Sequence, residues 1–171
     1  MGIKFRPAII SDLPSISRVL VDTWRSTFTG LLPSEFLDNM SYIHQEARHR
    51  RIFELSEVYY YVATNAADEI IGFASGGPTR IHNFRQGNEI YAIYVLTTYQ
   101  GKKIGTNLIR CVIDSLQSSG REGLVVIALG INPFRLFYEH LGGTKIPIEP
   151  ITIGSMAVNQ VAYTWSNIPS I

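Results

Sequence analysis

The sequence has little cysteine, no excess of one charge and no long apolar run. Its single cysteine, Cys111, excludes an intramolecular disulfide and favours a reducing compartment, so we expect a cytoplasmic protein. Its 15 Lys and Arg residues are balanced by 14 Asp and Glu residues. Nucleic-acid-binding proteins usually carry a basic face or a strong basic excess, so we expect no nucleic-acid partner.

Signals for membranes and metals are also missing. No apolar stretch approaches the length of a membrane span, and the N-terminal residues lack a signal-peptide pattern, so we expect no membrane partner. His44 and His49 are five residues apart, which is off the three- or four-residue spacing of one helix face, while His82 and His140 are isolated. The sequence also lacks HExxH and any cysteine cluster, so we expect no metal site.

The hydrophobic pattern predicts a single α/β domain, because 171 residues with 46% hydrophobic composition suffice for one core. The periodicities divide the chain into a strand, three helices, a β-hairpin, a strand, a helix, a strand, a helix and two final strands. The predicted helices cover residues 11–30, 33–40, 41–54, 104–116 and 132–143, and the predicted strands cover residues 3–8, 58–64, 69–77, 89–96, 123–130 and two segments within 144–168.

The stretch YQGKKIGTNLI, residues 99–109, is a glycine-spaced turn that leads directly into a helix. A helix N-terminus offers unpaired N–H groups and a positive dipole end, which together bind phosphate. Gly101 and Gly105 allow close approach of the backbone, and Lys102 and Lys103 add positive charge. The strings GxxxxGK[ST] and GxGxxG are absent, which excludes a P-loop and a dinucleotide fingerprint. Taken alone, the turn leaves an ordinary helix start open.

Residues 89–109 resemble the acetyl-CoA-binding segment of the GNAT superfamily of acyl-CoA-dependent N-acyltransferases. In that family a strand and a short loop precede Q/R-x-x-G-x-G/A at the start of a helix. Gln100 and Gly105 match this pattern, and Lys103 stands where the family usually has glycine. If this position needs positive φ, lysine costs on the order of 1 kcal/mol there.

A second block, residues 132–143, resembles the family's later helix, often N-x-x-A-x-x-F-Y-x-x-x-G. The matching residues are Asn132, Phe137, Tyr138 and Gly142, with Arg135 at the usual alanine. The element order fits the family over nearly the whole chain. The resemblance implies a GNAT-like acyl-CoA N-acyltransferase fold for residues 1–171. This fold is a mixed sheet of about seven strands, with helices on both faces and splayed central strands.

The resemblance implies that acetyl-CoA is the co-substrate. Its pantetheine arm would follow the backbone near Tyr94 and Val95, beside a bulge in that strand, and its pyrophosphate would sit on the amides of the turn. The implied cofactor-binding residues are Tyr94, Val95, Gln100, Gly101, Lys102, Lys103, Ile104, Gly105, Thr106, Asn132 and Tyr138. Asn132 has an alternative role as a helix cap only.

The implied reaction moves an acetyl group from a thioester to a primary amine. Such an amine, with a pKa of about 10, arrives mostly protonated, so a base must remove a proton. Glu89 would take that proton, the Val95 amide would bind the oxyanion, and Tyr138 would protonate the thiolate. Two alternatives remain open: Glu89 is a solvated strand end, and Tyr138 only packs beside the cofactor.

The sequence favours a small-molecule amine over a protein as acceptor, without choosing the amine. Two other functions remain open: a non-catalytic acyl-CoA-binding module, and acetylation of protein N-termini or lysines. Exposed strand edges are compatible with a homodimer. The charged residues on segments that would border the acceptor are Asp22, Glu35, Asp38, Glu89, Glu149, Arg25, Arg80 and Arg85.

Overall fold

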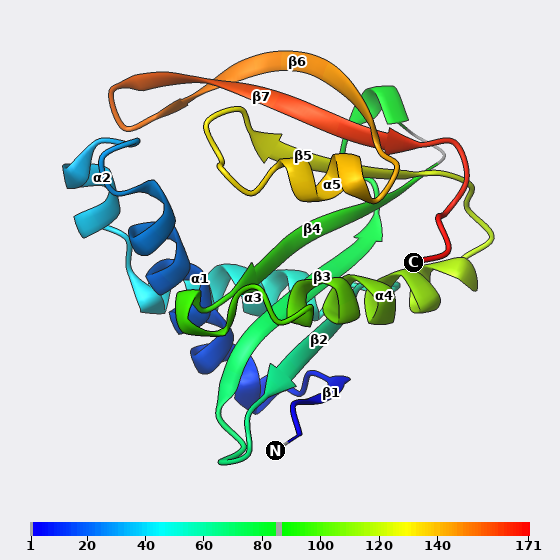
Figure 1. The fold of residues 1–171 in the computed structure, drawn as a ribbon, viewed down its shortest axis with the longest axis horizontal. Helices are drawn as coiled ribbons and strands as arrows, with labels where there is room; N and C mark the ends of the chain where they lie inside the picture. The colour runs from blue at the N-terminus through cyan, green and yellow to red at the C-terminus, as the bar shows by residue number, and fades with distance from the viewer. Residues whose placement is uncertain (1, 85–86) are drawn as a thin grey trace.

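The computed structural model describes residues 2–84 and 87–171. A seven-stranded open sheet runs through it in the order β1-β2-β3-β4-β5-β7-β6 (Figure 1). The strands are β1 (Lys4–Pro7), β2 (Tyr59–Thr64), β3 (Ile70–Pro78), β4 (Asn88–Val95), β5 (Leu124–Leu129), β6 (Thr144–Ile153) and β7 (Met156–Trp165). The α-helices are α1 (Leu13–Phe28), α2 (Ser34–Asp38), α3 (Tyr42–Phe53), α4 (Ile104–Gln117) and α5 (Leu136–His140).

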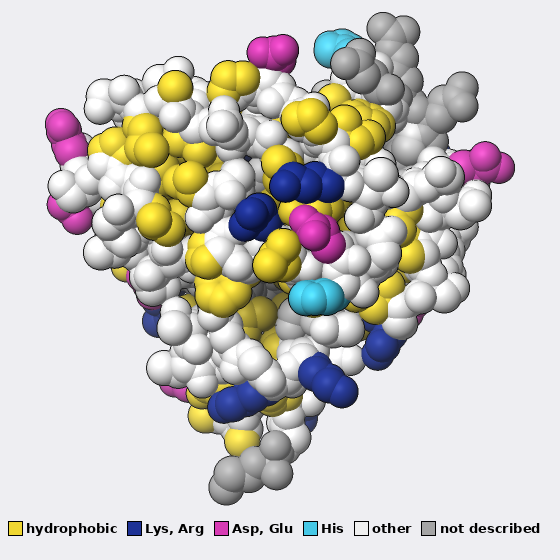
Figure 2. Space-filling model, turned by 45° about the horizontal axis from the view of Figure 1, so that its top comes forward, with side chains coloured by type: hydrophobic (Ala, Val, Ile, Leu, Met, Phe, Trp, Pro, Cys, Tyr) yellow, Lys and Arg dark blue, Asp and Glu magenta, His cyan; other side chains and the backbone are white. Residues whose placement is uncertain are grey.

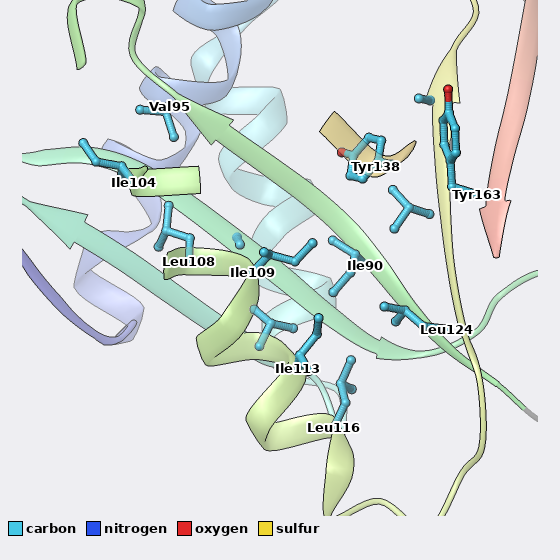
Figure 3. Packing of buried hydrophobic residues seen from close by; sticks show 14 of the residues in the cluster. Ile90, Val95, Ile104, Leu108, Ile109, Ile113, Leu116, Leu124, Tyr138 and Tyr163 are labelled. Atoms are coloured by element: carbon cyan, nitrogen blue, oxygen red, sulfur yellow. The ribbon is translucent and has the colours of Figure 1, made fainter. Parts of the chain in front are cut away.

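Helices cover both faces of the sheet, as predicted. On one face α1 and α3 pack on Tyr60 and Phe73, which belong to the predicted β2–β3 hairpin. On the other face α4 packs on β2 and β3, where Ala63 and Ala74 belong to the buried cluster, and α5 packs on β7 through Tyr138 and Tyr163 (Figure 1). The predicted apolar stripe of α4 is fully buried there, and it consists of Ile104, Leu108, Ile109, Val112, Ile113 and Leu116 (Figure 3).

The two central strands part after a short paired segment. β4 and β5 form the parallel pair of the sheet, and they are paired only over Asn88–Ile90 and Leu124–Val126. Ser75 of β3 pairs with Ala92, and the next β3 residue pairs with Ile90. The register therefore skips Tyr91, which marks a bulge in β4. The splayed central strands and the bulge in the first of them are both confirmed.

A helix was predicted over residues 132–143, but the observed helix is shorter. α5 covers only Leu136–His140. Asn132 Oδ1 accepts the N–H of Phe134 at 2.9 Å, and the Asn132 carbonyl accepts the N–H of Arg135 at 3.2 Å. An asparagine that bonds the amide two residues ahead stabilises a turn in competition with the first helical turn. Asn132 therefore closes a turn before the helix instead of capping α5.

Candidate active site

A cavity of about 590 Å³ lies where β4 and β5 part. The residues that line it are Thr23, Thr27, Phe28, Ile93, Tyr94, Val95, Tyr99, Gln100, Gly101, Lys103, Ile104, Gly105, Thr106, Asn132, Pro133, Phe134, Leu136, Phe137, Tyr138 and His140. Since α1 and α4 pack on opposite faces of the sheet and both contribute to the lining, the cavity connects the two faces. Figure 2 shows a hollow with hydrophobic side chains at its base and basic side chains along one edge.

The turn before α4 presents its backbone N–H groups to this cavity. Gly101 has φ 75° and Lys103 has φ 59°, so both adopt the left-handed conformation that places successive N–H groups on one side. Within the described residues, the N–H groups of residues 101–106 have no hydrogen-bond partner. Unpaired amides at a helix N-terminus are suited to hold an anion, so we refer to the turn of residues 101–106 with the start of α4 as the cradle. Lys103 takes the positive φ there that the family's usual glycine would tolerate without strain.

The free edge of β4 forms a second wall. The N–H of Leu96 bonds the carbonyl of Ile71 in β3 at 2.9 Å, and hydrogen-bonding direction alternates along a strand. The backbone groups of Ile93 and Val95 therefore point into the gap, whereas the Tyr94 backbone points toward β3. The Gln100 amide donates to the Val95 carbonyl at 2.9 Å, which leaves the Val95 N–H available. Of the two predicted backbone positions, Val95 therefore faces the gap and Tyr94 does not, while Ile93, which was not predicted, does.

Tyr138 lies between β4 and β5 (Figure 3), with 8% of its surface exposed. Its ring packs against Tyr163 at a centroid distance of 5.4 Å, and the Trp165 indole holds α5 by donating to the Leu141 carbonyl at 2.9 Å. The Tyr138 hydroxyl has no hydrogen-bond partner among the described residues. Burial raises the pKa of this hydroxyl above its ordinary value, and the nearby Tyr94 adds to the shift. At neutral pH Tyr138 is protonated and can donate.

A second tyrosine hydroxyl at the cavity is held by a tryptophan. Trp24 Nε1 donates to the Tyr94 hydroxyl at 2.9 Å, and burial raises the pKa of Tyr94. The sequence favours a core position for Trp24 over the acceptor-site border that the family resemblance implies for its helix, and it leaves open that Tyr94 lines the acceptor pocket; the bond between the two was not predicted. The one available signal was chemical, because an indole N–H needs a partner when it is largely buried.

Two predicted site residues lie outside the cavity lining. Glu89 is 3% exposed and accepts the backbone N–H of Arg80 at 2.8 Å and its Nη2 at 2.5 Å. The Arg80 guanidinium also lies 4.0 Å from the ring centroid of Tyr91. Lys102 Nζ donates to the Thr98 carbonyl at 3.4 Å, away from the cradle. The other ten predicted residues, Tyr94, Val95, Gln100, Gly101, Lys103, Ile104, Gly105, Thr106, Asn132 and Tyr138, do line the cavity.

Of the charged residues considered for the acceptor, those that the structure describes do not line the cavity either. Asp22 accepts the Tyr42 hydroxyl at 2.7 Å, and Arg25 donates to backbone carbonyls, including that of Met40 at 2.9 Å. The side chains of Glu35, Asp38 and Glu149 are exposed, and Arg85 is outside the described residues.

In residues 2–84 and 87–171, no helix has both the length and the apolar character to cross a membrane. The same residues contain no group of three or more His, Cys, Asp or Glu side chains arranged to hold a metal ion.

Comparison with known proteins identifies the family. The family model of the acetyltransferase (GNAT) domain matches residues 56–142, which is half of the chain. The chain belongs to the GNAT family. It is therefore an acyltransferase enzyme, and the matched region contains β2 to α5, including the cradle and Tyr138.

Similar proteins extend the match beyond that region. An uncharacterized N-acetyltransferase of Bacillus subtilis, YuaI, is 25% identical over 169 residues, covering 99% of this chain and 96% of the relative. An L-methionine sulfoximine/L-methionine sulfone acetyltransferase of Pseudomonas paraeruginosa is 26% identical over 127 residues, or 73% of this chain and 70% of the relative. The crystal structure of a phosphinothricin acetyltransferase from Sinorhizobium meliloti in complex with acetyl-CoA has the same fold, with a TM-score of 0.75 and 19% identity. The match covers 98% of this chain and 89% of that chain.

Proposed function

We propose that this GNAT protein transfers an acetyl group from acetyl-CoA to a primary amine of a small molecule, and that residues 1–171 act as one N-acetyltransferase domain. The observation that carries the proposal is the cavity itself. One cavity is lined by Gly101 and residues 103–106, whose amides are unpaired at the N-terminus of α4, by Ile93 and Val95 at the exposed edge of β4, and by Tyr138, whose hydroxyl has no partner among the described residues. A small-molecule acceptor is supported by the relatives named for L-methionine sulfoximine and phosphinothricin.

The residues present fit acetyl-CoA, which supplies the acetyl thioester when bound. The amides of residues 101–106 would hold its pyrophosphate, helped by the Lys103 ammonium. The backbone of Ile93 and Val95 would hydrogen-bond the pantetheine amides, in the manner of an added strand. Asn132 and Tyr138 line the same channel from the opposite wall.

The chain's own groups then support direct attack of the amine. The Val95 N–H would donate to the acetyl carbonyl oxygen, where negative charge develops as the amine attacks the acetyl carbon. As the new carbon–nitrogen bond forms and the carbon–sulfur bond breaks, the Tyr138 hydroxyl gives its proton to the departing sulfur. Protonation of Tyr138 at neutral pH, which its raised pKa favours, matches this role.

Glu89 is proposed to accept the amine proton. The proton would pass through an intervening water, because Glu89 lies outside the cavity lining and is paired with Arg80. Glu89→Gln tests this role. If Glu89 is the base, the rise of kcat with pH disappears in the variant. If Glu89 only pairs with Arg80, the melting temperature falls and the pH profile of kcat keeps its shape.

Initial-rate kinetics test the function as a whole. Acetyl-CoA and a small primary amine are varied together, and free thiol is detected. Direct transfer in a ternary complex predicts intersecting double-reciprocal lines. Parallel lines would contradict direct attack, and acetyl-CoA binding without thiol release in the presence of amines would favour the non-catalytic binding module.

A further inference from the structure

The bulge in β4 lies at the point where that strand leaves β5. The pairing of β4 with β5 ends at Ile90, and the residue that the register skips, Tyr91, is the next one along the strand. Beyond it, β4 continues to pair with β3 from Ala92 to Val95. A bulge bends its strand and increases the local twist. The conformation at Tyr91 therefore determines how the following backbone, including the Val95 N–H, is directed.

The Tyr91 side chain is held at two points. Its hydroxyl donates to the carbonyl of Pro78, the last residue of β3, at 2.6 Å. The Arg80 guanidinium lies over its ring, 4.0 Å from the centroid, where a cation is attracted to an aromatic face. Burial raises the pKa of Tyr91 to about 12, so the hydroxyl stays protonated at neutral pH and keeps its bond to Pro78.

Arg80 is in turn fixed by Glu89, which lies on the other side of Ile90 from Tyr91. The buried Glu89 carboxylate accepts the Arg80 backbone N–H at 2.8 Å and its Nη2 at 2.5 Å. A buried carboxylate is costly without such partners, so this pairing keeps the guanidinium in place. We refer to Tyr91, Arg80, Glu89 and the Pro78 carbonyl as the bulge clasp. The clasp ties the residues on both sides of Ile90 to the end of β3.

Two glycines in β3 make room for the bulge clasp. A Cβ on Gly77 would lie 2.7 Å from the Tyr91 hydroxyl oxygen, and a Cβ on Gly76 would lie 2.8 Å from the Glu89 carbonyl oxygen. Both distances are shorter than Cβ contacts in proteins allow, so a side chain at either position would displace the ring or the bulged backbone. The facing strand is therefore adapted to this position of Tyr91.

We propose that the bulge clasp positions the Val95 N–H for the acetyl group, and that Tyr91 is the positioning residue on which this depends. The inference rests on the proposed function and adds to it a residue outside the cavity lining. The N–H must point at the oxygen on which negative charge develops, and a misplacement of about 1 Å can cost about a hundredfold in rate. Tyr91 acts through the backbone of β4 and contacts neither substrate.

Tyr91→Phe tests the positioning role, because it removes the bond to Pro78 and keeps the ring beneath Arg80. We expect kcat at saturating substrates to fall about tenfold when it is measured well below the melting temperature of the variant. Stabilisation by free CoA should be unchanged, since the cradle is a separate segment. Tyr61→Phe is the matched control, because it removes a hydroxyl that bonds Ser115 and should lower stability without changing kcat.

Infrared spectra of bound acetyl-CoA with an isotope-labelled acetyl carbonyl report the position of the Val95 N–H without turnover. A hydrogen bond to a carbonyl oxygen lowers its stretching frequency. The wild-type protein should therefore shift the band to lower frequency than in water-free solvent, and Tyr91→Phe should shift it less. The pH profile of kcat should keep its shape in the variant, because the amine proton is not affected.

A lower kcat together with a smaller band shift supports the positioning role. An unchanged band overturns it whether or not kcat falls, and an unchanged kcat with a lower melting temperature means that the bulge clasp only stabilises the fold. A changed shape of the pH profile overturns it as well, because Tyr91 would then act through Glu89. If acetyl-CoA neither stabilises the folded wild-type protein nor gives a bound band, and no amine releases thiol, the proposed function itself fails.

Discussion

Tyr138 is the side chain on which the proposed chemistry depends most directly. Tyr138→Phe removes the hydroxyl and keeps the ring that packs against Tyr163. We expect kcat to fall about 100-fold, with the melting temperature and acetyl-CoA stabilisation unchanged. Tyr61→Phe is the control, because the Tyr61 hydroxyl bonds Ser115 away from the cavity. Equal kcat in wild type and Tyr138→Phe would remove the acid role and leave Tyr138 as a packing residue.

Lys103 allows the effect of backbone strain to be separated from that of charge. Its φ of 59° is unfavourable for any residue with a Cβ, and glycine relieves the strain. Lys103→Gly should therefore be more stable than Lys103→Ala by about 1 kcal/mol in thermal unfolding without ligand. Both variants lose the same charge, so their acetyl-CoA affinities should match each other and lie below that of wild type. Equal stability of the two variants would show that this turn is not strained.

At the scale of elements, α3 is attached to the sheet through a buried histidine. His49 is 5% exposed, and its Nδ1 lies 3.0 Å from the Tyr60 hydroxyl while its ring meets Phe73 edge-on at 5.4 Å. Burial, with a smaller contribution from Arg48, lowers the pKa of His49 to about 4. The folded protein therefore excludes a proton that the unfolded chain binds below pH 6.5. The stability from neutral His49 is complete above that pH and is lost as pH falls toward 4.

We expect the unfolding free energy to drop by about 2 kcal/mol between pH 7 and pH 5 on account of His49. Denaturant titrations of wild type and His49→Phe at both pH values measure the difference. The variant should lose about 2 kcal/mol less over the same interval. Parallel losses in the two proteins would contradict the assignment to His49.

Local patterns determined how far the sequence could predict these elements. The α4 stripe and the β2–β3 hairpin follow from periodicity within one segment, so both were predicted. The shortened α5 was missed because the residues after Asn132 first form turns with bonds between residues three apart, and the α-helix begins only at Leu136.

Contacts between distant segments were beyond sequence reasoning. The bond from Trp24 to Tyr94 joins residues 70 positions apart, and periodicity indicates only that both are apolar. The pairing of Glu89 with Arg80 depends on how the loop after β3 folds back, which no single-segment pattern encodes. The turn of residues 99–106 could be recognised because it is one continuous segment, and its role in holding a phosphate stays a prediction.

At the scale of the whole molecule, the parting of β4 and β5 makes the site. The parallel pairing ends at Ile90 and Val126, and the resulting opening joins the α4 face to the α1 face. Acetyl-CoA held on one face and an amine held on the other would meet at the Val95 N–H, so the acetyl group could pass directly between them without a covalent enzyme intermediate. This arrangement is the physical reason for expecting a ternary complex.

The central claim is that this opening binds acetyl-CoA, and thermal unfolding tests it most directly. At about 100 times its dissociation constant, acetyl-CoA should stabilise the fold by about 2.7 kcal/mol. For a chain of this size the melting temperature should rise by roughly 5 to 10 °C, while free adenosine at the same concentration should have no effect. A folded protein whose melting temperature does not change with acetyl-CoA, or changes equally with adenosine, would contradict the account.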